Sequence, residues 1–186
     1  MEWSAKWIAP AQEMGDVCPV FVKEFAGVEG AAKAELFITA MGVYEAGLNG
    51  SRVGEYVLAP GWTSYEKRQQ YQCYDVTELL EKSNRLEVVV GKGWYRSPMP
   101  GWMNEEGKNV KAHIPAGLIA QLVLTAEDGT KQVIATDESW KAEESRIRFS
   151  EIYDGETCDA TFEAKEVQPV VCLDKGTQHL IPQQGE

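Results

Sequence analysis

The sequence predicts an all-β domain, a β-sandwich or jelly roll with one short helix. Apolar and polar residues alternate with a period of two in several segments, as they do in half-buried strands. Asn-Gly and Asp-Gly dipeptides, which favour tight hairpin turns, separate some of these segments. Only one stretch has a helical pattern. Many short strands joined by turns, with almost no helix, are typical of sandwiches and jelly rolls.

Five segments are expected to form strands: residues 19–25, 34–41, 85–91, 117–127 and 168–173. In residues 34–41, Leu36 and Ile38 share one face and Phe37 takes the other. In residues 117–127 the alternate leucines point inward, while Gln121 and Thr125 point outward.

Turn and helix signals fill the intervals between the strands. Asn49-Gly50 and Asp128-Gly129 each predict a type I′ hairpin turn, because both central positions tolerate positive φ. Residues 75–82 (DVTELLEK) predict two turns of helix, with Asp75 or Thr77 as the cap. Residues 1–186 therefore form a single β-sandwich domain, and residues 1–18 are expected to be a loosely attached N-terminal arm.

Composition excludes several functional classes. The net charge of −11 repels a phosphate backbone, so we expect no nucleic acid as a partner. No apolar run approaches the roughly 18–20 residues that cross a bilayer, and the first residues lack a signal pattern, so we expect a cytoplasmic chain with no membrane contact. The four cysteines are scattered, and only two histidines are present, which argues against structural zinc and for reduced, partly buried thiols.

The sequence contains no recognisable catalytic motif. Nucleophile elbows, P-loops and dinucleotide fingerprints are all lacking. Glycoside hydrolysis needs two carboxylates at a set separation, and a pair can always be nominated among 29 acidic residues. Neither Glu45 nor the acids of residues 150–160 (Glu151, Asp154, Glu156 and Asp159) are singled out by their surroundings, so we interpret them as solvated acids.

Aromatic residues concentrate in two loop-rich stretches. Rings on such loops either plug the ends of the core or contact sugars, whose C–H patches lie well on aromatic faces. The polar residues that sugar hydroxyls require lie close in sequence to these rings. The candidate carbohydrate-binding residues are Glu45, Asn49, Trp94, Tyr95, Arg96 and Trp102.

Two loops are given different roles. Residues 59–71 (APGWTSYEKRQQY) are expected to be a connection whose Trp62 and Tyr65 pack onto the sheet. Residues 93–103 (GWYRSPMPGWM) are the better candidate for a binding surface, because prolines stiffen a loop and lower its entropy loss on binding. Trp102 and Met103 are expected to be exposed there.

Residues 41–97 resemble a specific family. The segments MGVYEAGLNGSRVG, LAPGWTSYEKRQQYQCYDVTELL and GKGWYRS occur in the order found in the N-terminal β-sandwich domain of bacterial α-L-rhamnosidases, glycoside hydrolase family 78. KWIAP near the start and SEIYDGETCDA near the end extend the resemblance over residues 6–186.

The resemblance implies part of an inverting, metal-independent hydrolase that removes terminal α-L-rhamnose from glycosides. The catalytic acid and base of that family lie in a longer, C-terminal (α/α)6 barrel, so this chain is expected to be a non-catalytic accessory domain. Its implied partners are that catalytic domain and a rhamnose-containing carbohydrate. Alternatives are a free-standing rhamnose-binding module and a protein-docking β-sandwich whose contact residues are Trp102 and Met103.

Calcium enters only through the resemblance, because some members bind rhamnose through a calcium ion on a related sandwich. The loops around Asn49 and after Trp94 are where such a site would lie. Ser97, Pro98 and Met99 offer few acidic ligands there. The sequence therefore predicts no metal ligands and no obligatory cofactor.

Overall fold

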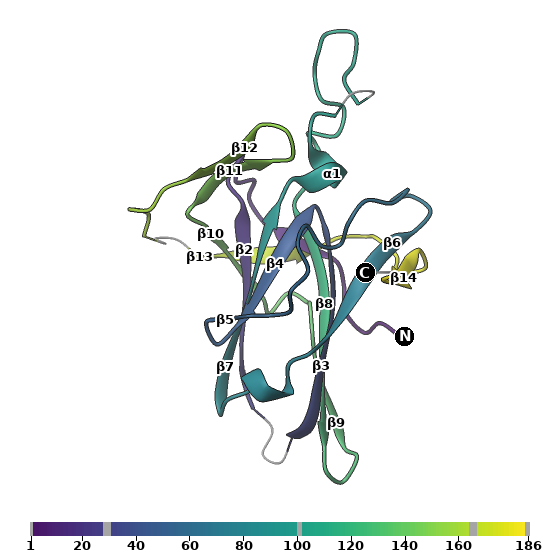
Figure 1. Cartoon of the computed structure of the whole chain (residues 1–186), viewed down its shortest axis with the longest axis vertical. Coiled ribbons are helices and arrows are strands. Elements are labelled where there is room, and N and C mark those ends of the chain that lie inside the picture. The colour runs from purple at the N-terminus through teal and green to yellow at the C-terminus, as the bar shows by residue number, and fades with distance from the viewer. Residues whose placement is uncertain (1, 28–30, 100–101, 164–166, 185–186) are drawn as a thin grey trace.

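Two layers of β-strands pack face to face in the computed structural model, which describes residues 2–27, 31–99, 102–163 and 167–184 (Figure 1). The first layer contains β3 (Ala31–Met41), β6 (Gln69–Asp75), β8 (Gly117–Ala126), β9 (Lys131–Ala135) and β14 (Leu180–Pro182). The second contains β2 (Pro19–Ala26), β4 (Val43–Leu48), β5 (Ser51–Arg52), β7 (Ser83–Gly91) and β10 (Lys141–Glu144). The predicted all-β sandwich is confirmed, and all five expected strands form.

Two strands join the layers into one continuous sheet. β1 (Ile8–Pro10) pairs with β8 of the first layer and with β13 (Val167–Cys172), and β13 pairs with β10 of the second layer. A separate hairpin of β11 (Ile147–Glu151) and β12 (Gly155–Cys158) lies at the end of the second layer (Figure 1). Residues 8–10, within the stretch expected to be a loosely attached arm, are therefore part of the sheet.

The core lies between the two layers, where alternate side chains of each strand point inward. In the pairing of β3 with β8, Leu36 lies opposite Leu122 and Ile38 opposite Ala120, and all four side chains are buried. Trp140 and Phe21 fill the space from the second layer. Full burial of each large apolar side chain contributes about 1.5–3 kcal/mol, so this interior accounts for most of the stability of the sandwich.

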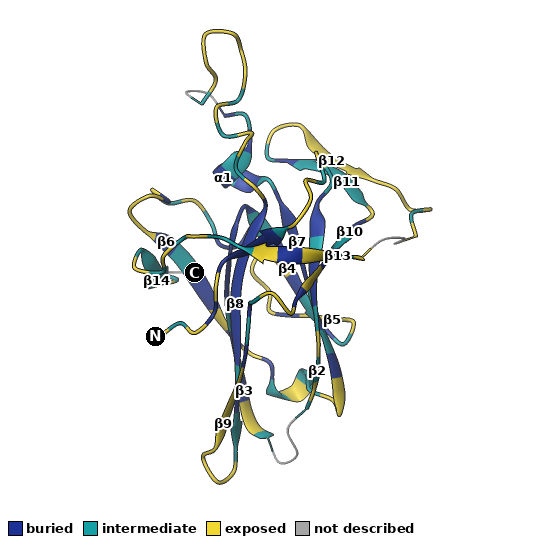
Figure 2. Ribbon diagram, turned by 180° about the vertical axis from the view of Figure 1, so that it is seen from behind, coloured by how far each residue is buried: buried dark blue, intermediate teal, exposed yellow. Residues whose placement is uncertain are grey.

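A second apolar cluster covers the outer face of the first layer. Ile119 and Trp7, which form its centre, are both fully buried. Gln121 is also buried on this face, because its Oε1 accepts hydrogen bonds from the backbone N–H groups of Ser4 and Ala5. The alternation predicted Gln121 as outward-facing, which is correct, but the N-terminal segment hides it from solvent. Figure 2 shows β8 and the strands next to it as the most buried part of the molecule.

The helical elements differ from the prediction. Residues 75–82 form only a three-residue 3-10 turn, η1 (Thr77–Leu79), in place of two turns of helix. Asp75 Oδ1 accepts hydrogen bonds from the Thr77 N–H and hydroxyl, which favours a tight turn at this point. The short α-helix, α1 (Gly93–Arg96), lies instead directly after β7.

The two dipeptide turns also differ from each other. Asn49 and Gly50 have φ values of 54° and 78° and connect β4 to β5, as expected for a type I′ turn. At the β8–β9 hairpin only Gly129 has a positive φ, of 84°, and its N–H donates to the Ala126 carbonyl. This loop is one residue longer than a type I′ turn and has the glycine bulge typical of such hairpins.

Candidate functional site

The first turn after β7 positions the candidate residues Trp94, Tyr95 and Arg96. Gly93 begins α1 with a φ of +53°, and a Cβ there would lie 2.7 Å from the Val43 backbone nitrogen. Only glycine fits this close approach to the start of β4. Because α1 is a single turn, the three side chains that follow point in three directions.

Tyr95 points inward and anchors α1. Its ring lies 4.6 Å from the ring of Tyr65, and both residues are buried in the outer cluster. Burial raises the pKa of Tyr95, whose hydroxyl accepts a hydrogen bond from Lys175 Nζ at 3.4 Å. Tyr65 packs onto the sheet as predicted, and Tyr95 has the role of a core residue.

Trp94 points toward Trp62 of the β5–β6 connection. The two indole rings are almost parallel, at 8°, with centroids 6.3 Å apart. Trp62 is 58% exposed, so it does not pack onto the sheet as the sequence suggested. The neighbouring Val57 and Leu58 are exposed as well, at 77% and 47%. We call Trp62 and Trp94 the aromatic surface.

Arg96 points toward the N-terminal segment, away from the aromatic surface. It lines a cavity of about 240 Å³ between residues 10–19 and residues 112–116. Burial lowers its pKa to about 10, while the nearby Cys18 and Asp16 act in the opposite direction. The guanidinium therefore remains charged at neutral pH.

Trp102 lies on the loop that protrudes beyond α1, where most residues are exposed (Figure 2). The ammonium of Lys111 lies 3.5 Å from the centroid of its ring, a cation–π contact that holds the two sides of the loop together with the Met103–Asn109 bridge. Trp102 is half-buried, whereas Met103 is exposed as expected. Pro100 and Gly101 of the expected binding loop lie outside the described residues.

Asn49 and Glu45 do not lie beside the Trp62 and Trp94 rings at the α1 end of the sandwich. Asn49 lies at the far end of β4, where its side-chain amide donates to the Leu79 carbonyl and to Asn84 Oδ1 and accepts from the Arg85 N–H. These bonds occupy the amide. Glu45 is exposed midway along β4 and forms an ion pair with Arg52 at 3.6 Å.

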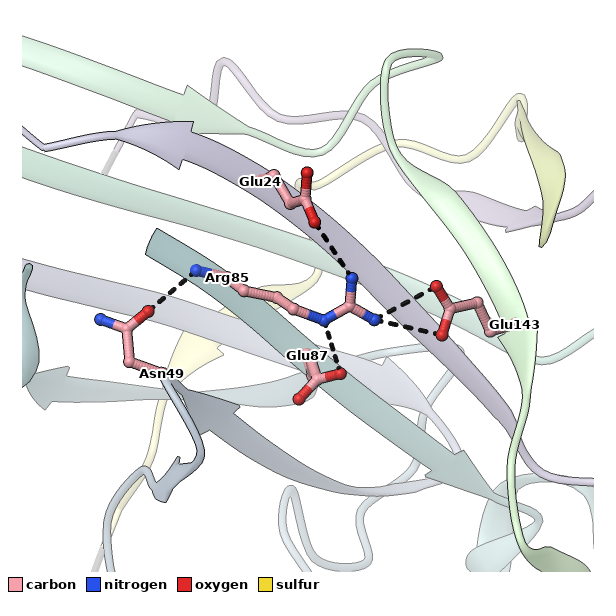
Figure 3. A network of polar contacts seen from close by, with 5 residues as sticks. All are labelled: Glu24, Asn49, Arg85, Glu87 and Glu143. Carbon is pink, nitrogen blue, oxygen red and sulfur yellow. Dashed lines mark hydrogen bonds and ion pairs between the residues drawn. The ribbon is translucent and has the colours of Figure 1, made fainter. Parts of the chain in front are cut away.

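Figure 3 shows the polar network next to Asn49, on the outer face of the second layer. The Arg85 guanidinium binds Glu87 through Nε at 2.8 Å and Glu143 through Nη2 at 3.1 Å. Its Nη1 also lies 3.3 Å from Glu24. Three adjacent strands are thus joined by one fully paired arginine.

Two of the candidate acids after β10, Glu151 and Asp159, accept hydrogen bonds from neighbouring residues. Glu151 Oε2 accepts from the N–H groups of Tyr153 and Asp154. Burial raises the pKa of Glu151, but these hydrogen bonds outweigh it and the net shift is downward. Asp159 has its pKa lowered by hydrogen bonds from the Thr161 hydroxyl and N–H. A glycosidase acid needs a raised pKa, so both shifts have the wrong sign for that role.

The described part of the chain lacks the features of a metal site and of a membrane-spanning helix. No group of three or more His, Cys, Asp and Glu side chains there has metal-binding geometry. None of its helices is long and apolar enough to cross a bilayer. All four cysteines are free thiols: Cys18 is buried, Cys172 half-buried, and Cys73 and Cys158 exposed. The thiols are thus less uniformly buried than expected.

Residues 29–185 match the family described as the alpha-L-rhamnosidase N-terminal domain. The chain belongs to this family. An alpha-L-rhamnosidase of Formosa agariphila is 38% identical over 174 residues, which is 87% of this chain and 18% of that protein. The resemblance seen in the sequence is thereby confirmed.

Solved structures agree with this assignment. The native α-L-rhamnosidase of Aspergillus terreus superposes with a TM-score of 0.83 at 36% identity, covering 96% of this chain and 22% of that one. The Streptomyces avermitilis alpha-L-rhamnosidase, solved in complex with L-rhamnose, gives a TM-score of 0.73 at 34% identity, covering 85% and 16%. This α-L-rhamnosidase N-terminal domain thus spans about a fifth of the relatives it matches.

Sequence reasoning missed Trp62 as part of the exposed surface and missed the cavity beside Arg96. The signal for Trp62 was the preceding Pro60-Gly61 dipeptide, which marks a turn, because turns and loops run over the protein surface. The cavity has no local sequence signal, because its walls come from three segments far apart in the chain.

Proposed function

We propose that this chain is a non-catalytic accessory domain of an α-L-rhamnosidase and that its aromatic surface faces the substrate path of the catalytic part. The observation that supports the proposal most is the pair of parallel rings, with Trp62 largely exposed over Trp94. Exposed aromatic and apolar side chains on adjacent loops mark contact surfaces rather than ordinary solvent-facing loops. The family assignment supports an α-L-rhamnosidase as the parent enzyme.

The orientation of α1 explains how such a surface stays rigid. Tyr95 is fixed in the outer cluster by Tyr65, so the Trp94 ring on the same turn has little freedom. Trp62 rests on that ring and is held in place before a ligand or neighbouring domain arrives. A rigid aromatic contact loses little entropy on binding.

Hydrolysis tests the non-catalytic part of the proposal. The isolated chain is incubated with an aryl α-L-rhamnoside, and we expect release of the aryl group at the rate of buffer alone. Turnover well above buffer that survives repurification would refute it.

In the full parent enzyme, Trp62→Ala is expected to raise KM several-fold with little change in kcat, whereas Val133→Ala, at an exposed site on β9, is expected to leave both unchanged.

A second candidate function is rhamnose binding by the isolated domain, which the same parallel rings favour. Stacking of a pyranose on an exposed indole requires no other protein. Titration calorimetry with L-rhamnose, with and without calcium, separates the two roles. Saturable heat lost in Trp62→Ala supports the binding module, and heat that depends on calcium indicates a metal-assisted site. No heat at millimolar sugar leaves the accessory role.

A further inference from the structure

The cavity beside α1 has the features of a ligand site. Its rim consists of exposed residues, among them Gln12, Glu13 and His113, and its inner wall includes Arg96 together with the buried Pro19 and Ala116. Its volume of about 240 Å³ leaves room for several waters, and therefore for a small ligand.

The charge on the half-buried Arg96 is not balanced in the way that the charge on Arg85 is. Arg85, near the start of β7, contacts three carboxylates (Figure 3). In the described part of the chain no ion pair includes the Arg96 guanidinium, and its buried Nε has no hydrogen-bond partner. Burying an unpaired charge is costly, and proteins normally compensate it with an opposite charge.

The groups next to Arg96 do not neutralise its positive charge. Asp16 on the cavity rim is paired with Lys92 through an ion pair. The thiol of Cys18 is buried, and burial raises its pKa to about 11, so it is neutral at physiological pH. Glu13 is exposed at the rim and is free to accept hydrogen bonds from a ligand. The inner wall is thus cationic, and the rim provides both hydrogen-bond donors and acceptors.

We propose that this cavity binds a small sugar acid, a uronate, with its carboxylate on Arg96 and its hydroxyls on the rim. A planar guanidinium matches a carboxylate with two parallel hydrogen bonds. Gln12, Glu13 and His113 supply the mixed donors and acceptors that hydroxyls require. The site is separate from the aromatic surface, because Arg96 and Trp94 leave α1 in different directions.

Calorimetric titration of the chain with sodium glucuronate or galacturonate tests the proposal. Glucose is the neutral control of equal size, acetate is the carboxylate without hydroxyls, and L-rhamnose probes the other surface. We expect saturable uronate binding that is at least tenfold tighter than binding of glucose or acetate. Equal binding of uronate and glucose, or no saturation below about 10 mM uronate, would overturn the proposal.

Two variants locate the binding. Ala112→Trp fills the cavity from an exposed rim position, and Ala160→Trp is the matched control at an exposed position outside it. Uronate binding is expected to disappear in the first and persist in the second. Arg96→Gln is expected to weaken uronate binding at least tenfold without affecting glucose; if this variant does not fold, Ala112→Trp decides. Unchanged uronate binding in Ala112→Trp contradicts the assignment of the site.

Discussion

Replacement of Asn49 by alanine should destabilise the sandwich more than any other single change at a hairpin tip. The Asn49 amide makes three hydrogen bonds, to the Leu79 carbonyl, the buried Asn84 side chain and the Arg85 N–H, at 2.8–2.9 Å. Each such bond contributes about 1 kcal/mol net. Asn49 also holds a φ of 54°, where alanine costs roughly 1 kcal/mol more than glycine. Allowing for water at this half-buried site, we expect a loss of about 2–4 kcal/mol in the free energy of unfolding.

Urea unfolding followed by tryptophan fluorescence measures this loss. Asn49→Gly removes the three bonds but accepts the positive φ, so it should be about 1 kcal/mol less damaging than Asn49→Ala. Asn104→Ala is the control, because the Asn104 side chain bonds only within its own exposed loop. A loss below about 1 kcal/mol in Asn49→Ala, or identical losses in the alanine and glycine variants, would show that the account of this turn is wrong.

Three further outcomes are expected. Ile38→Ala opens a cavity between the layers and should cost about 2–5 kcal/mol in urea unfolding; a smaller loss would mean that the core is loosely packed. The folded-state pKa of Glu151 is lowered, so its stabilisation exists above the unfolded pKa and disappears as pH falls through the folded value. The stability gap between wild type and Glu151→Gln should therefore shrink from pH 7 to pH 3, and a widening gap contradicts the assignment. In native labelling read by mass spectrometry, Cys73 and Cys158 should react first and Cys18 only on unfolding.

The strands were predictable from sequence because their inward side chains repeat with a period of two. Leu36 and Ile38 are buried in β3 as the alternation requires, and Asn49-Gly50 forms the expected turn. These features depend on neighbours within a few residues. Local pattern therefore determines which segments are strands and which dipeptides reverse the chain.

Long-range contacts explain what the sequence did not predict. Nothing local to residues 8–10 shows that they pair with residues 170–172. The helix expected over residues 75–82 is shortened because Asp75 bonds to Thr77 and the Ala34 N–H bonds to the Thr77 hydroxyl, which ties the turn to β3. Trp94, Tyr95 and Arg96 were chosen together as sugar ligands, yet one helical turn sends them to three different environments.

The placement of β1 has a consequence for how the chain is made. Residues 8–10 are synthesised well before β13 (residues 167–172), one of their two partner strands. β1 therefore cannot complete its pairing until β13 has emerged from the ribosome. Until then β1 has an unpaired edge, and protection of that edge by a chaperone would raise the yield of folded protein.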